Sequence, residues 1–168
     1  MMKDMEILID TNIVLDWLLE REPFLKNARD IMEPCIRGEI SGHLASHTLL
    51  NIFYIARKHK SVEERKEILR LLCNKFNVIG IDKQIIMNTL GNDKWPDLED
   101  GLQMQCAITE NLDYIVTRDL GGFENSTILS CSPEEFFKHI YIPASIVIIS
   151  YLAANVFIVL AVVLHNRA

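Results

Sequence analysis

The sequence has few cysteines, and their arrangement builds neither a covalent nor a zinc framework. The four cysteines are far apart, form no Cys-x-x-Cys pair and have no histidine at zinc-finger spacing. Neither a disulfide scaffold nor a structural zinc site is therefore expected, and the thiols should be reduced and mostly buried. A secretory leader is not expected either, because residues 1–6 carry charges of both signs and no apolar stretch. The simplest expectation is a cytoplasmic domain.

The sequence also lacks the basic surplus of a protein that holds nucleic acid by bulk charge. Its formal net charge is −6 and its pI is near 5.3. Proteins that bind polyanions through their surface usually carry an excess of lysine and arginine on the binding face. If nucleic acid is the substrate, positive charge has to enter the site from another source. With 168 residues, the chain is long enough for one domain with a full core and too short for two of ordinary size.

The C-terminal region has no charge over one long stretch. Residues 144–164 form an uncharged run of 21 residues, and every Asp and Glu lies at or before Glu135. The run matches the ~20 apolar residues that cross a bilayer core as a helix, so a membrane anchor is one interpretation. The alternatives are a segment that packs against a dimer partner and an extension with no role in the fold. We therefore divide the chain into a domain over residues 1–141 and an apolar tail over 142–168.

Short apolar runs alternate with amphipathic segments along the first 141 residues. This alternation predicts strands separated by helices, which is typical of a mainly parallel sheet with helices on both faces. We therefore expect an α/β domain followed by an apolar C-terminal helix. The expected strands cover residues 6–9, 43–45, 76–81, 114–117 and 127–130, and the expected helices cover residues 13–19, 23–37, 46–58, 61–75, 83–90, 97–110 and a segment from 133.

Several of the expected helices begin with recognisable signals. Pro23 is placed to open the second helix, since proline fits the first helical turn. Ser46 and Asp82 are predicted N-caps. Ser61 and Glu64 have the spacing of a capping box. These signals set the expected starts of the helices that follow them.

Four acids come at the positions where a parallel sheet binds ligands. Asp10 directly follows the first expected strand, and Asp119 comes two residues after the strand that ends at Thr117. Asp97 and Asp100 are three residues apart in the first turn of a helix and share one face. Each acid alone is more simply explained as a helix cap or a dipole-compensating residue. Because the carboxyl ends of the strands form the binding crevice of such sheets, four acids at that edge favour a functional site.

A cluster of carboxylates predicts a bound cation. Neighbouring negative charges raise one another's pKa unless a cation shares the site. Oxygen ligands without cysteine or histidine suit Mg²⁺ or Mn²⁺. Such a metal supplies the positive charge that phosphate needs and lowers the pKa of a bound water for attack. Phosphodiester hydrolysis is therefore the reaction that the acids predict.

Other polar residues accompany the acids, and each has a plainer alternative. Asn51 stands in an apolar helix, where it is either an exposed position or a ligand or water-positioning group. Thr11, Asn12 and Thr117 lie beside the acids and either orient the carboxylates or cap the short helix nearby.

The densest positive run of the chain covers residues 57–60. Its Arg57, Lys58 and Lys60 are either solvated helix surface or contacts to RNA phosphates. The histidines show no metal-ligand spacing, and no chemistry is assigned to His43, His47, His59 or His139.

Four segments together resemble a known family. They are ILIDTNIVLDWL at 7–18, ASHTLLNIFYIARK at 45–58, DLEDGLQMQCA at 97–107 and DYIVTRDLGGF at 113–123. In this order and at this spacing they resemble the successive motifs of the PIN-domain nucleases, in particular the compact VapC-like toxins of toxin–antitoxin modules. The resemblance covers about residues 5–140.

The resemblance implies a three-layer α/β/α sandwich and a divalent-metal ribonuclease that is usually a homodimer and is restrained by a small antitoxin. By position, Asp10 matches the family's first acid, Asp100 the acid of the second half, and Asp119 the acid of the T-R-D motif. Asp97 is an additional acid, and Asn51 stands where the family commonly has glutamate. One carboxylate fewer predicts a single bound Mg²⁺ or Mn²⁺, or a looser second one.

The leading hypothesis is thus a metal-dependent endoribonuclease that acts on RNA as the toxin of a toxin–antitoxin module. Its catalytic domain is expected in the cytoplasm, and whether the tail tethers it to a membrane is left open. The main alternative is a non-catalytic member that binds RNA or a protein partner, since a glutamate is missing and the charge is acidic. A phosphoryl-transfer receiver domain also places an Asp after a parallel strand. It requires an acidic pair after the first strand and a lysine after a late strand, which DTN and TRD do not supply.

Overall fold

The computed structural model describes residues 5–95 and 97–141. The chain divides into two compact units, Met1–Glu134 and Glu135–Ala168, which are described separately. No helix within the described ranges is long and apolar enough to cross a membrane. The apolar run at 144–164, with its expected helix, lies outside the described residues, so the membrane-anchor and dimer-packing interpretations stay predictions. The proposed boundary after residue 141 stays a prediction as well.

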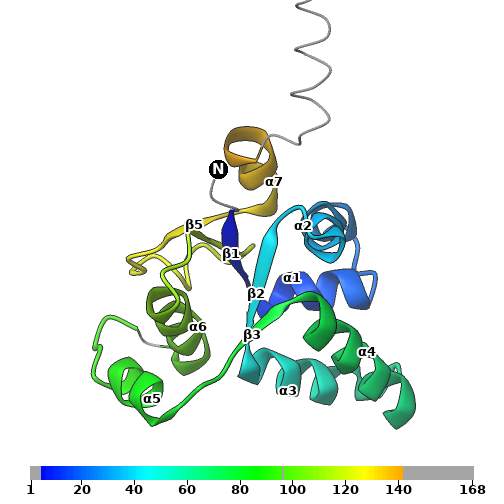
Figure 1. Ribbon diagram of the computed structural model, residues 1–168, viewed down its shortest axis with the longest axis horizontal. Helices are drawn as coiled ribbons and strands as arrows, with labels where there is room; N and C mark the ends of the chain where they lie inside the picture. Colours follow the sequence, from blue (N-terminus) through cyan, green and yellow to red (C-terminus); the bar gives the residue numbers. More distant parts are fainter. Residues whose placement is uncertain (1–4, 96, 142–168) are drawn as a thin grey trace, which may run out of the picture. The chain divides into compact units, whose positions relative to one another are not determined.

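The first unit is built on a parallel sheet with the strand order β3-β2-β1-β4-β5 (Figure 1). Leu8 of the central strand β1 is in register with His43 of β2 on one side and with Ile115 of β4 on the other. The direction of strand progression therefore reverses between β1 and β4, and the carboxyl ends of these two strands form the switch point where such sheets bind ligands. The strands are β1 (Glu6–Ile9), β2 (Ser41–Ala45), β3 (Asn77–Ile79), β4 (Tyr114–Val116) and β5 (Leu129–Cys131).

Helices cover both faces of this sheet. In Figure 1, helices α1 to α4 lie on one side of the strands and helices α5 and α6 on the other. This arrangement confirms the expected α/β/α sandwich with a parallel central sheet. The helices are α1 (Thr11–Leu18), α2 (Leu25–Arg37), α3 (Ser46–Ile55), α4 (Val62–Lys75), α5 (Lys83–Leu90) and α6 (Leu98–Thr109), with a 3₁₀ turn, η1 (Ala56–Lys58), after α3.

Burial on both faces explains the continuous apolar run of the first strand. Ile7, Leu8 and Ile9 are all fully buried. A strand covered on both sides exposes neither of its alternating sets of side chains, so every position becomes apolar. Leu8 shares a core cluster with Met104 of α6 and with Phe123 of the loop after β4. Full burial of a side chain of this size stabilises the fold by about 1.5–3 kcal/mol.

Two predicted helix starts are confirmed at the level of hydrogen bonds. The Ser61 hydroxyl accepts a hydrogen bond from Glu64 N, and the Glu64 carboxylate accepts one from Ser61 N, which completes the capping box of α4. The Asp82 carboxylate accepts a hydrogen bond from Ile85 N at 2.8 Å at the start of α5. Gly38 ends α2 in the left-handed region, with φ of 76°, as a C-terminal glycine is expected to do.

The second helix begins later than predicted. α2 starts at Leu25, and Pro23 lies in the turn before it. Phe24 N donates a hydrogen bond to Arg21 O at 2.9 Å, so the backbone around Pro23 closes a turn instead of opening the helix. The proline signal was correct in placing a helix nearby and wrong by two residues in its start.

Ser46 is not the N-cap that the sequence predicts. It is the first residue of α3, Ala45 holds the N-cap position, and no side chain caps this end. The Ser46 hydroxyl instead accepts a hydrogen bond from Ile81 N at 3.2 Å, which ties α3 to the segment after β3. The helix expected to reach residue 58 ends at Ile55 and continues only as the 3₁₀ turn.

Sheet pairing sets the strand ends more tightly than composition does. The expected strand over 76–81 is reduced to β3, because its partner β2 ends at Ala45, which pairs with Ile79. β2 begins at Ser41, before the expected start, since Ser41 pairs with Glu6. The last strand lies over Leu129–Cys131 instead of 127–130, where it pairs with β4. The final helix is a short turn, α7 (Pro133–Glu135), followed by a π-helical segment, η2 (Phe136–Ile140).

Candidate metal-binding and nucleic-acid site

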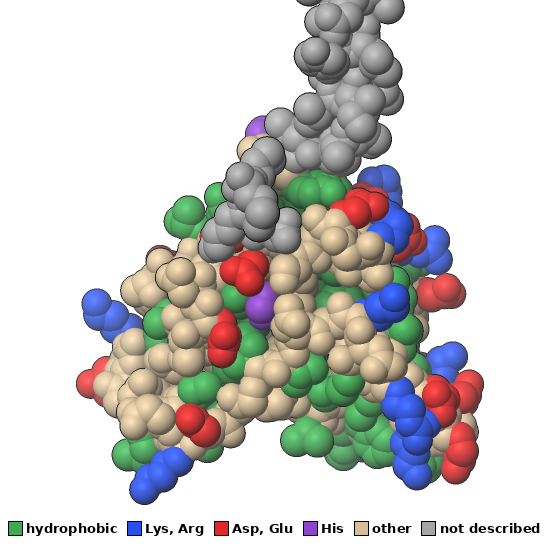
Figure 2. Space-filling model, in the orientation of Figure 1, with side chains coloured by type: hydrophobic (Ala, Val, Ile, Leu, Met, Phe, Trp, Pro, Cys, Tyr) green, Lys and Arg blue, Asp and Glu red, His purple; other side chains and the backbone are tan. Residues whose placement is uncertain are grey.

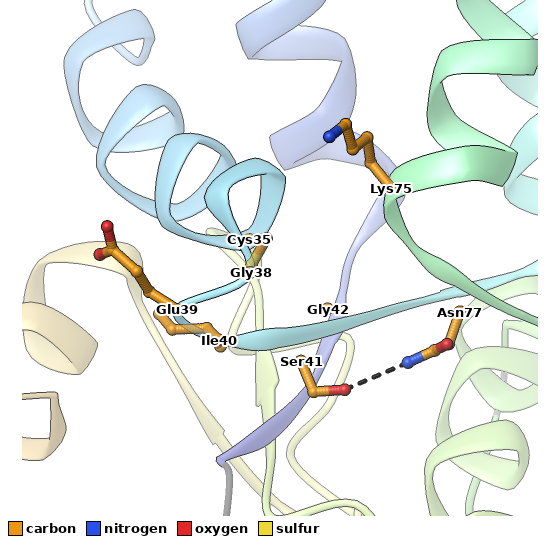
Figure 3. Close-up of a pocket in the computed structure, with 8 residues that line it drawn as sticks. All are labelled: Cys35, Gly38, Glu39, Ile40, Ser41, Gly42, Lys75 and Asn77. Atoms are coloured by element: carbon orange, nitrogen blue, oxygen red, sulfur yellow. Dashed lines mark hydrogen bonds between the residues drawn. The ribbon is translucent and has the colours of Figure 1, made fainter.

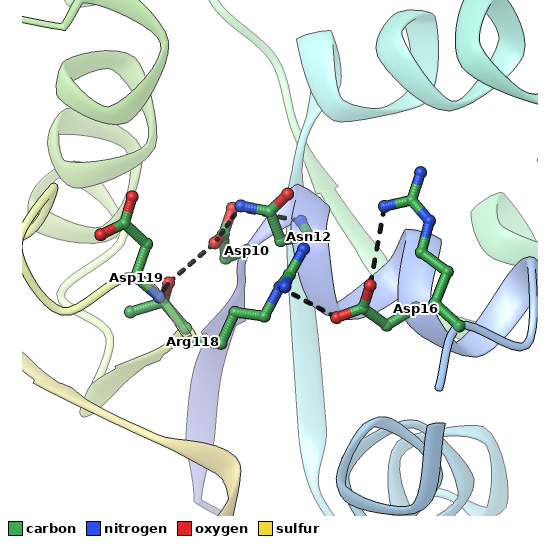
Figure 4. A network of polar contacts seen from close by, with 7 residues as sticks. Asp10, Asn12, Asp16, Arg118 and Asp119 are labelled. Atoms are coloured by element: carbon green, nitrogen blue, oxygen red, sulfur yellow. Dashed lines mark hydrogen bonds and ion pairs between the residues drawn. The ribbon is translucent and has the colours of Figure 1, made fainter. Parts of the chain in front are cut away.

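Asp10 is the buried centre of the polar groups at the carboxyl end of β1. Only 2% of its surface is exposed. Its Oδ1 accepts hydrogen bonds from Gln103 Nε2 at 3.1 Å and, as the N-cap of α1, from Asn12 N at 3.4 Å. Its Oδ2 accepts hydrogen bonds from Thr117 Oγ1 at 2.7 Å and from Asn12 Nδ2 at 3.3 Å (Figure 4). All these donors are neutral, so they orient the carboxylate without cancelling its charge.

Thr117 links Asp10 to the loop that carries Asp119. The Thr117 hydroxyl donates to Asp10 and accepts a hydrogen bond from Asp119 N at 2.9 Å. Thr117 is fully buried, whereas Asp119 is exposed. The Asp119 Oδ1 accepts a hydrogen bond from Gly122 N at 3.3 Å. Thr117 and Asn12 therefore both donate hydrogen bonds to the Asp10 carboxylate, and their role as supports of a metal ligand stays a prediction.

Three acids come from the N-terminal turn of α6. Asp97 is the N-cap, and its Oδ1 accepts hydrogen bonds from Glu99 N at 2.8 Å and from Asp100 N at 3.1 Å. The plainer reading of Asp97 as a helix cap is thus correct for one of its oxygens. Asp100 is half-buried, and Glu99 is exposed. Glu99 is an acid of this region that the sequence motifs did not single out.

Gly122 marks the place where Asp100 and Asp119 approach each other. A Cβ on Gly122 would collide with Asp100 Oδ2 and would lie 3.5 Å from Asp119 Oδ2. Both carboxylates therefore border the same small space beside this glycine. Only a residue without a side chain leaves that space open.

A pocket of about 390 Å³ collects most of these groups. The helix α3 contributes Asn51 and Tyr54 to its wall, and the start of α1 contributes Thr11 and Asn12. The Thr11 hydroxyl is hydrogen bonded to that of Thr48 at 2.9 Å, so it joins α1 to α3 and does not contact a carboxylate. We define the acid cluster as the four acids that line this pocket together with the acid beside Gly122: Asp10, Asp97, Glu99, Asp100 and Asp119.

The acid cluster carries negative charge that basic side chains do not balance. Burial, and after it the negative charges of the other four members, together raise the pKa of Asp100 to about 6. Within residues 5–95 and 97–141, no member of the cluster forms an ion pair with lysine, arginine or histidine. Such a site is stabilised by an added cation.

Arg118 lies next to Asp119 in sequence, but it forms an ion pair with another carboxylate. Its Nε is 3.0 Å from Oδ2 of the fully buried Asp16, and Arg21 Nη1 is 3.6 Å from Oδ1 (Figure 4). Burial raises the pKa of Asp16, while the two arginines lower it. The Arg118 guanidinium also lies over the Phe24 ring, 4.2 Å from its centroid. The arginine of the T-R-D motif therefore anchors its loop instead of neutralising the acid cluster.

The donor set of the acid cluster fits a hard divalent cation. All candidate ligands are oxygen atoms, which suits Mg²⁺ or Mn²⁺. The buried Gln103 Oε1 has no hydrogen-bond partner in the described part of the chain, although its amide nitrogen donates to Asp10. A bound ion with its waters would supply partners to such an atom. In the same part of the chain, no three acidic, histidine or cysteine side chains are close enough to hold an ion in their present positions. Asp10, Asp100 and Asp119, with Asp97 and Glu99 nearby, are the residues that could hold one.

Asn51 contacts an acid from another helix. It is half-buried, and its Nδ2 donates a hydrogen bond to Glu99 Oε1 at 2.7 Å. Sequence reasoning missed Glu99 and Gln103. Gln103 follows Asp100 by three residues and so shares its helix face, which is the signal that could have identified it.

The basic run lies partly at the rim of the pocket. The Arg57 guanidinium stacks on the Tyr54 ring, 3.4 Å from its centroid, and donates to Tyr54 O at 2.9 Å. Tyr54 lines the pocket, so Arg57 contacts a residue of the pocket wall without lining the pocket itself. Lys58 is exposed, and Lys60 lines a different pocket and lies 4.0 Å from a Glu64 carboxylate oxygen. Figure 2 shows acidic and basic side chains interspersed on the displayed face, without a continuous basic patch.

A second cavity, of about 280 Å³, lies at the amino end of β2 (Figure 3). Asn77 Nδ2 donates to Ser41 Oγ there at 3.1 Å, and Lys75 lies on the wall. The cavity lies at the amino ends of the strands and Asp10 at their carboxyl ends, since Ser41 begins β2 and Asp10 follows the end of β1. It contains none of the predicted site residues.

Comparison with known protein families identifies the class to which the chain belongs. The sequence profile of the PIN domain family matches residues 6–121. The chain therefore belongs to the PIN domain family, as the four segments indicated. Among curated proteins, no significant match to the sequence is found.

Solved structures, among them a toxin–antitoxin complex, share this fold. A toxin–antitoxin complex from Klebsiella pneumoniae has a TM-score of 0.60 and 20% identity, covering 76% of this chain and 97% of that one. DNA-bound VapBC from Salmonella typhimurium has a TM-score of 0.57 and 20% identity, covering 77% and 98%. A VapC from Mycobacterium tuberculosis, described as a toxin that cleaves the sarcin–ricin loop, has a TM-score of 0.51 and 11% identity, covering 65% and 86%.

Proposed function

We propose that this protein is a divalent-metal-dependent endoribonuclease that hydrolyses RNA phosphodiester bonds as the toxin of a toxin–antitoxin module. The observation that carries the proposal is the acid cluster at the switch point of the sheet. Its charge has no basic partner among the described residues, and the pKa of Asp100 is raised to about 6. Membership of the PIN domain family and the cleavage named for the Mycobacterium tuberculosis relative support it.

The acid cluster would provide the metal ligands, and polar residues next to it would orient them. Asp10, Asp100 and Asp119 would hold Mg²⁺ or Mn²⁺, and Asp97 would contribute through the oxygen that does not cap α6. The ion supplies a polarised water and a positive charge for the scissile phosphate. Thr117, Asn12 and Gln103 hold the Asp10 carboxylate in one orientation through the contacts described above. Such contacts to ligands commonly affect metal affinity as strongly as some ligands do.

RNA would approach over α3 and the turn η1. Arg57 is positioned at the rim of the pocket, where it would contact a phosphate close to the acid cluster. Lys58 and Lys60 would contact the strand further from the cut. A few such contacts, together with the metal, would replace the basic surplus that the chain lacks.

The partners of the chain follow from its structural neighbours. The Klebsiella pneumoniae and Salmonella typhimurium structures are complexes with antitoxins, one of them with DNA. We infer that this protein is likewise restrained by a small antitoxin, that it forms a homodimer and that its catalytic domain works in the cytoplasm. Attachment to a membrane through residues 144–164 stays a prediction from the sequence.

One observation favours a second candidate function. In the described residues the acids are not close enough to hold an ion as they stand. A non-catalytic PIN protein that binds RNA or a protein partner would have no need to bring them together. Both functions use the same fold, and only the first includes cleavage of RNA.

Metal-dependent cleavage separates the two functions. The full-length protein is incubated with single-stranded and stem-loop RNAs in Mg²⁺, in Mn²⁺ and in EDTA, and the products are resolved on a sequencing gel. The proposal predicts discrete products with either metal and none with EDTA. Binding of these RNAs without cleavage in either metal would establish the non-catalytic function instead.

A further inference from the structure

We propose that Glu99 supplies the carboxylate that is absent at position 51, so that the metal site receives an acid from α6 where the sequence of α3 provides only an amide. The inference rests on the proposed function, since it concerns the same metal. It assigns Glu99 as a metal ligand and Asn51 as its positioning residue.

The contact that carries the inference joins two helices. Asn51 Nδ2 donates to Glu99 Oε1 at 2.7 Å, although the residues are separated by 48 positions in the chain. Both residues line the pocket that Asp10 and Asp100 also line. The Glu99 side chain is therefore directed across the pocket toward α3 instead of into solvent away from it.

The chemistry of the pair explains why position 51 carries an amide. A carboxamide donates hydrogen bonds and carries no charge, so it holds a nearby carboxylate without repelling it. A glutamate at position 51 would place a second carboxylate against Glu99, and like charges at that distance disfavour each other. With Asn51 in place, Glu99 retains a second oxygen for a cation.

Glu99 also occupies the first turn of α6, where an acid interacts favourably with the helix dipole. This general role does not require the contact with Asn51. Glu63 provides a matched comparison, because it is the second residue of α4 as Glu99 is of α6, and it is also exposed. Glu63 is not part of the pocket that holds the acid cluster.

The test measures Mn²⁺ binding by titration calorimetry, so it does not depend on finding the RNA. Full-length wild type is compared with Glu99→Gln, with the control Glu63→Gln and with the exchanged pair Asn51→Glu/Glu99→Gln. Glu99→Gln should weaken binding by roughly 10-fold or more, on the scale seen when the surroundings of a metal site are altered. Glu63→Gln should bind as wild type does, and the exchanged pair should recover most of the loss.

Asp119→Asn separates failure of this inference from failure of the metal site itself. If Asp119→Asn weakens Mn²⁺ binding and Glu99→Gln does not, Glu99 is not a ligand and the proposed nuclease is unaffected. If neither weakens it, the acid cluster is not the metal site and both proposals fail. A loss in Glu99→Gln that the exchanged pair does not recover would overturn the pairing with position 51. Thermal unfolding in EDTA shows that each variant is folded.

Discussion

The Thr117 hydroxyl donates a hydrogen bond to Asp10 Oδ2 at 2.7 Å. The Thr117 hydroxyl oxygen also accepts a hydrogen bond from Asp119 N at 2.9 Å. One buried side chain at the end of β4 therefore orients the buried acid after β1 and fixes the backbone of the exposed acid after β4. The two strand ends that form the switch point are coupled through this single hydroxyl.

Replacing that hydroxyl tests the coupling. Thr117→Val keeps the shape of the side chain but leaves Asp10 Oδ2 and Asp119 N each without one partner. We expect a loss of about 1–3 kcal/mol in the free energy of unfolding, because unpaired buried polar groups are costly. Mn²⁺ affinity should fall as well, which calorimetry measures. Thr117→Ser retains the hydroxyl and should keep the affinity, so equal losses in both variants would contradict a role for the hydrogen bonds.

The glycine pair after Asp119 provides a test of the space between the acids. A Cβ on Gly122 would collide with Asp100 Oδ2, whereas a Cβ on Gly121 would lie 3.5 Å from Asp119 Oδ1, an ordinary contact. Gly122→Ala should turn the Asp100 carboxylate aside and weaken Mn²⁺ binding severalfold, with less than about 1 kcal/mol of destabilisation, because the clash is with the end of a rotatable side chain. Gly121→Ala should bind Mn²⁺ normally. A normal Mn²⁺ affinity in Gly122→Ala would show that Asp100 does not bind the metal from this position.

Asp100 should make the metal-free protein less stable as the pH rises. Its pKa is about 6 in the folded protein against an ordinary value of 3.8. The folded state therefore binds the proton more tightly, and stability falls as the pH rises from about 4 to about 6. In EDTA at pH 7, Asp100→Asn should be more stable than wild type by about 1 kcal/mol after solvent screening. The difference should disappear near pH 4 in thermal melts, and a difference independent of pH would contradict this origin.

Arg57 should contribute to RNA binding through its charge. Removing one phosphate contact reduces the slope of log affinity against log salt by about one. We expect Arg57→Ala to weaken binding of RNA at low salt and to reduce this slope, as measured by fluorescence anisotropy in Ca²⁺ or EDTA. Lys75→Ala, on the second cavity at the opposite edge of the sheet, is the control. Equal effects of the two substitutions would indicate general attraction rather than a contact at the rim.

The sequence predicts the parts of this molecule that depend on local order. Asp10 could be placed at a strand end because an apolar run stops there, and the capping box of Ser61 and Glu64 is a local pattern. The contact of Asn51 with Glu99 was out of reach, because it depends on how α3 and α6 face each other across the pocket. Ser46 was misassigned for a similar reason, since its hydroxyl is used by a backbone group from another part of the chain.

Arg118 shows why charge could not be assigned from spacing alone. It lies between Thr117 and Asp119 in the sequence, and only the structure shows that it pairs with the buried Asp16. The residues matched through the resemblance do gather at one edge of the sheet, since Asp10 and Asp100 share a pocket and Asp100 and Asp119 share the space at Gly122. The sequence did not identify every residue that hydrogen bonds to these acids, because such contacts depend on tertiary packing.

RNA cleavage by Asp119→Asn and Asp10→Asn in Mn²⁺ shows whether the acid cluster is a catalytic metal site. Asp119 is exposed, so its replacement leaves the fold intact, and Asp93→Asn in an exposed loop outside the pocket is the control. We expect both site variants to lose cleavage by roughly 100-fold or more, while the control cuts as wild type does. Cleavage at the wild-type rate by a folded Asp119→Asn and Asp10→Asn would contradict a metal-dependent site built on these acids.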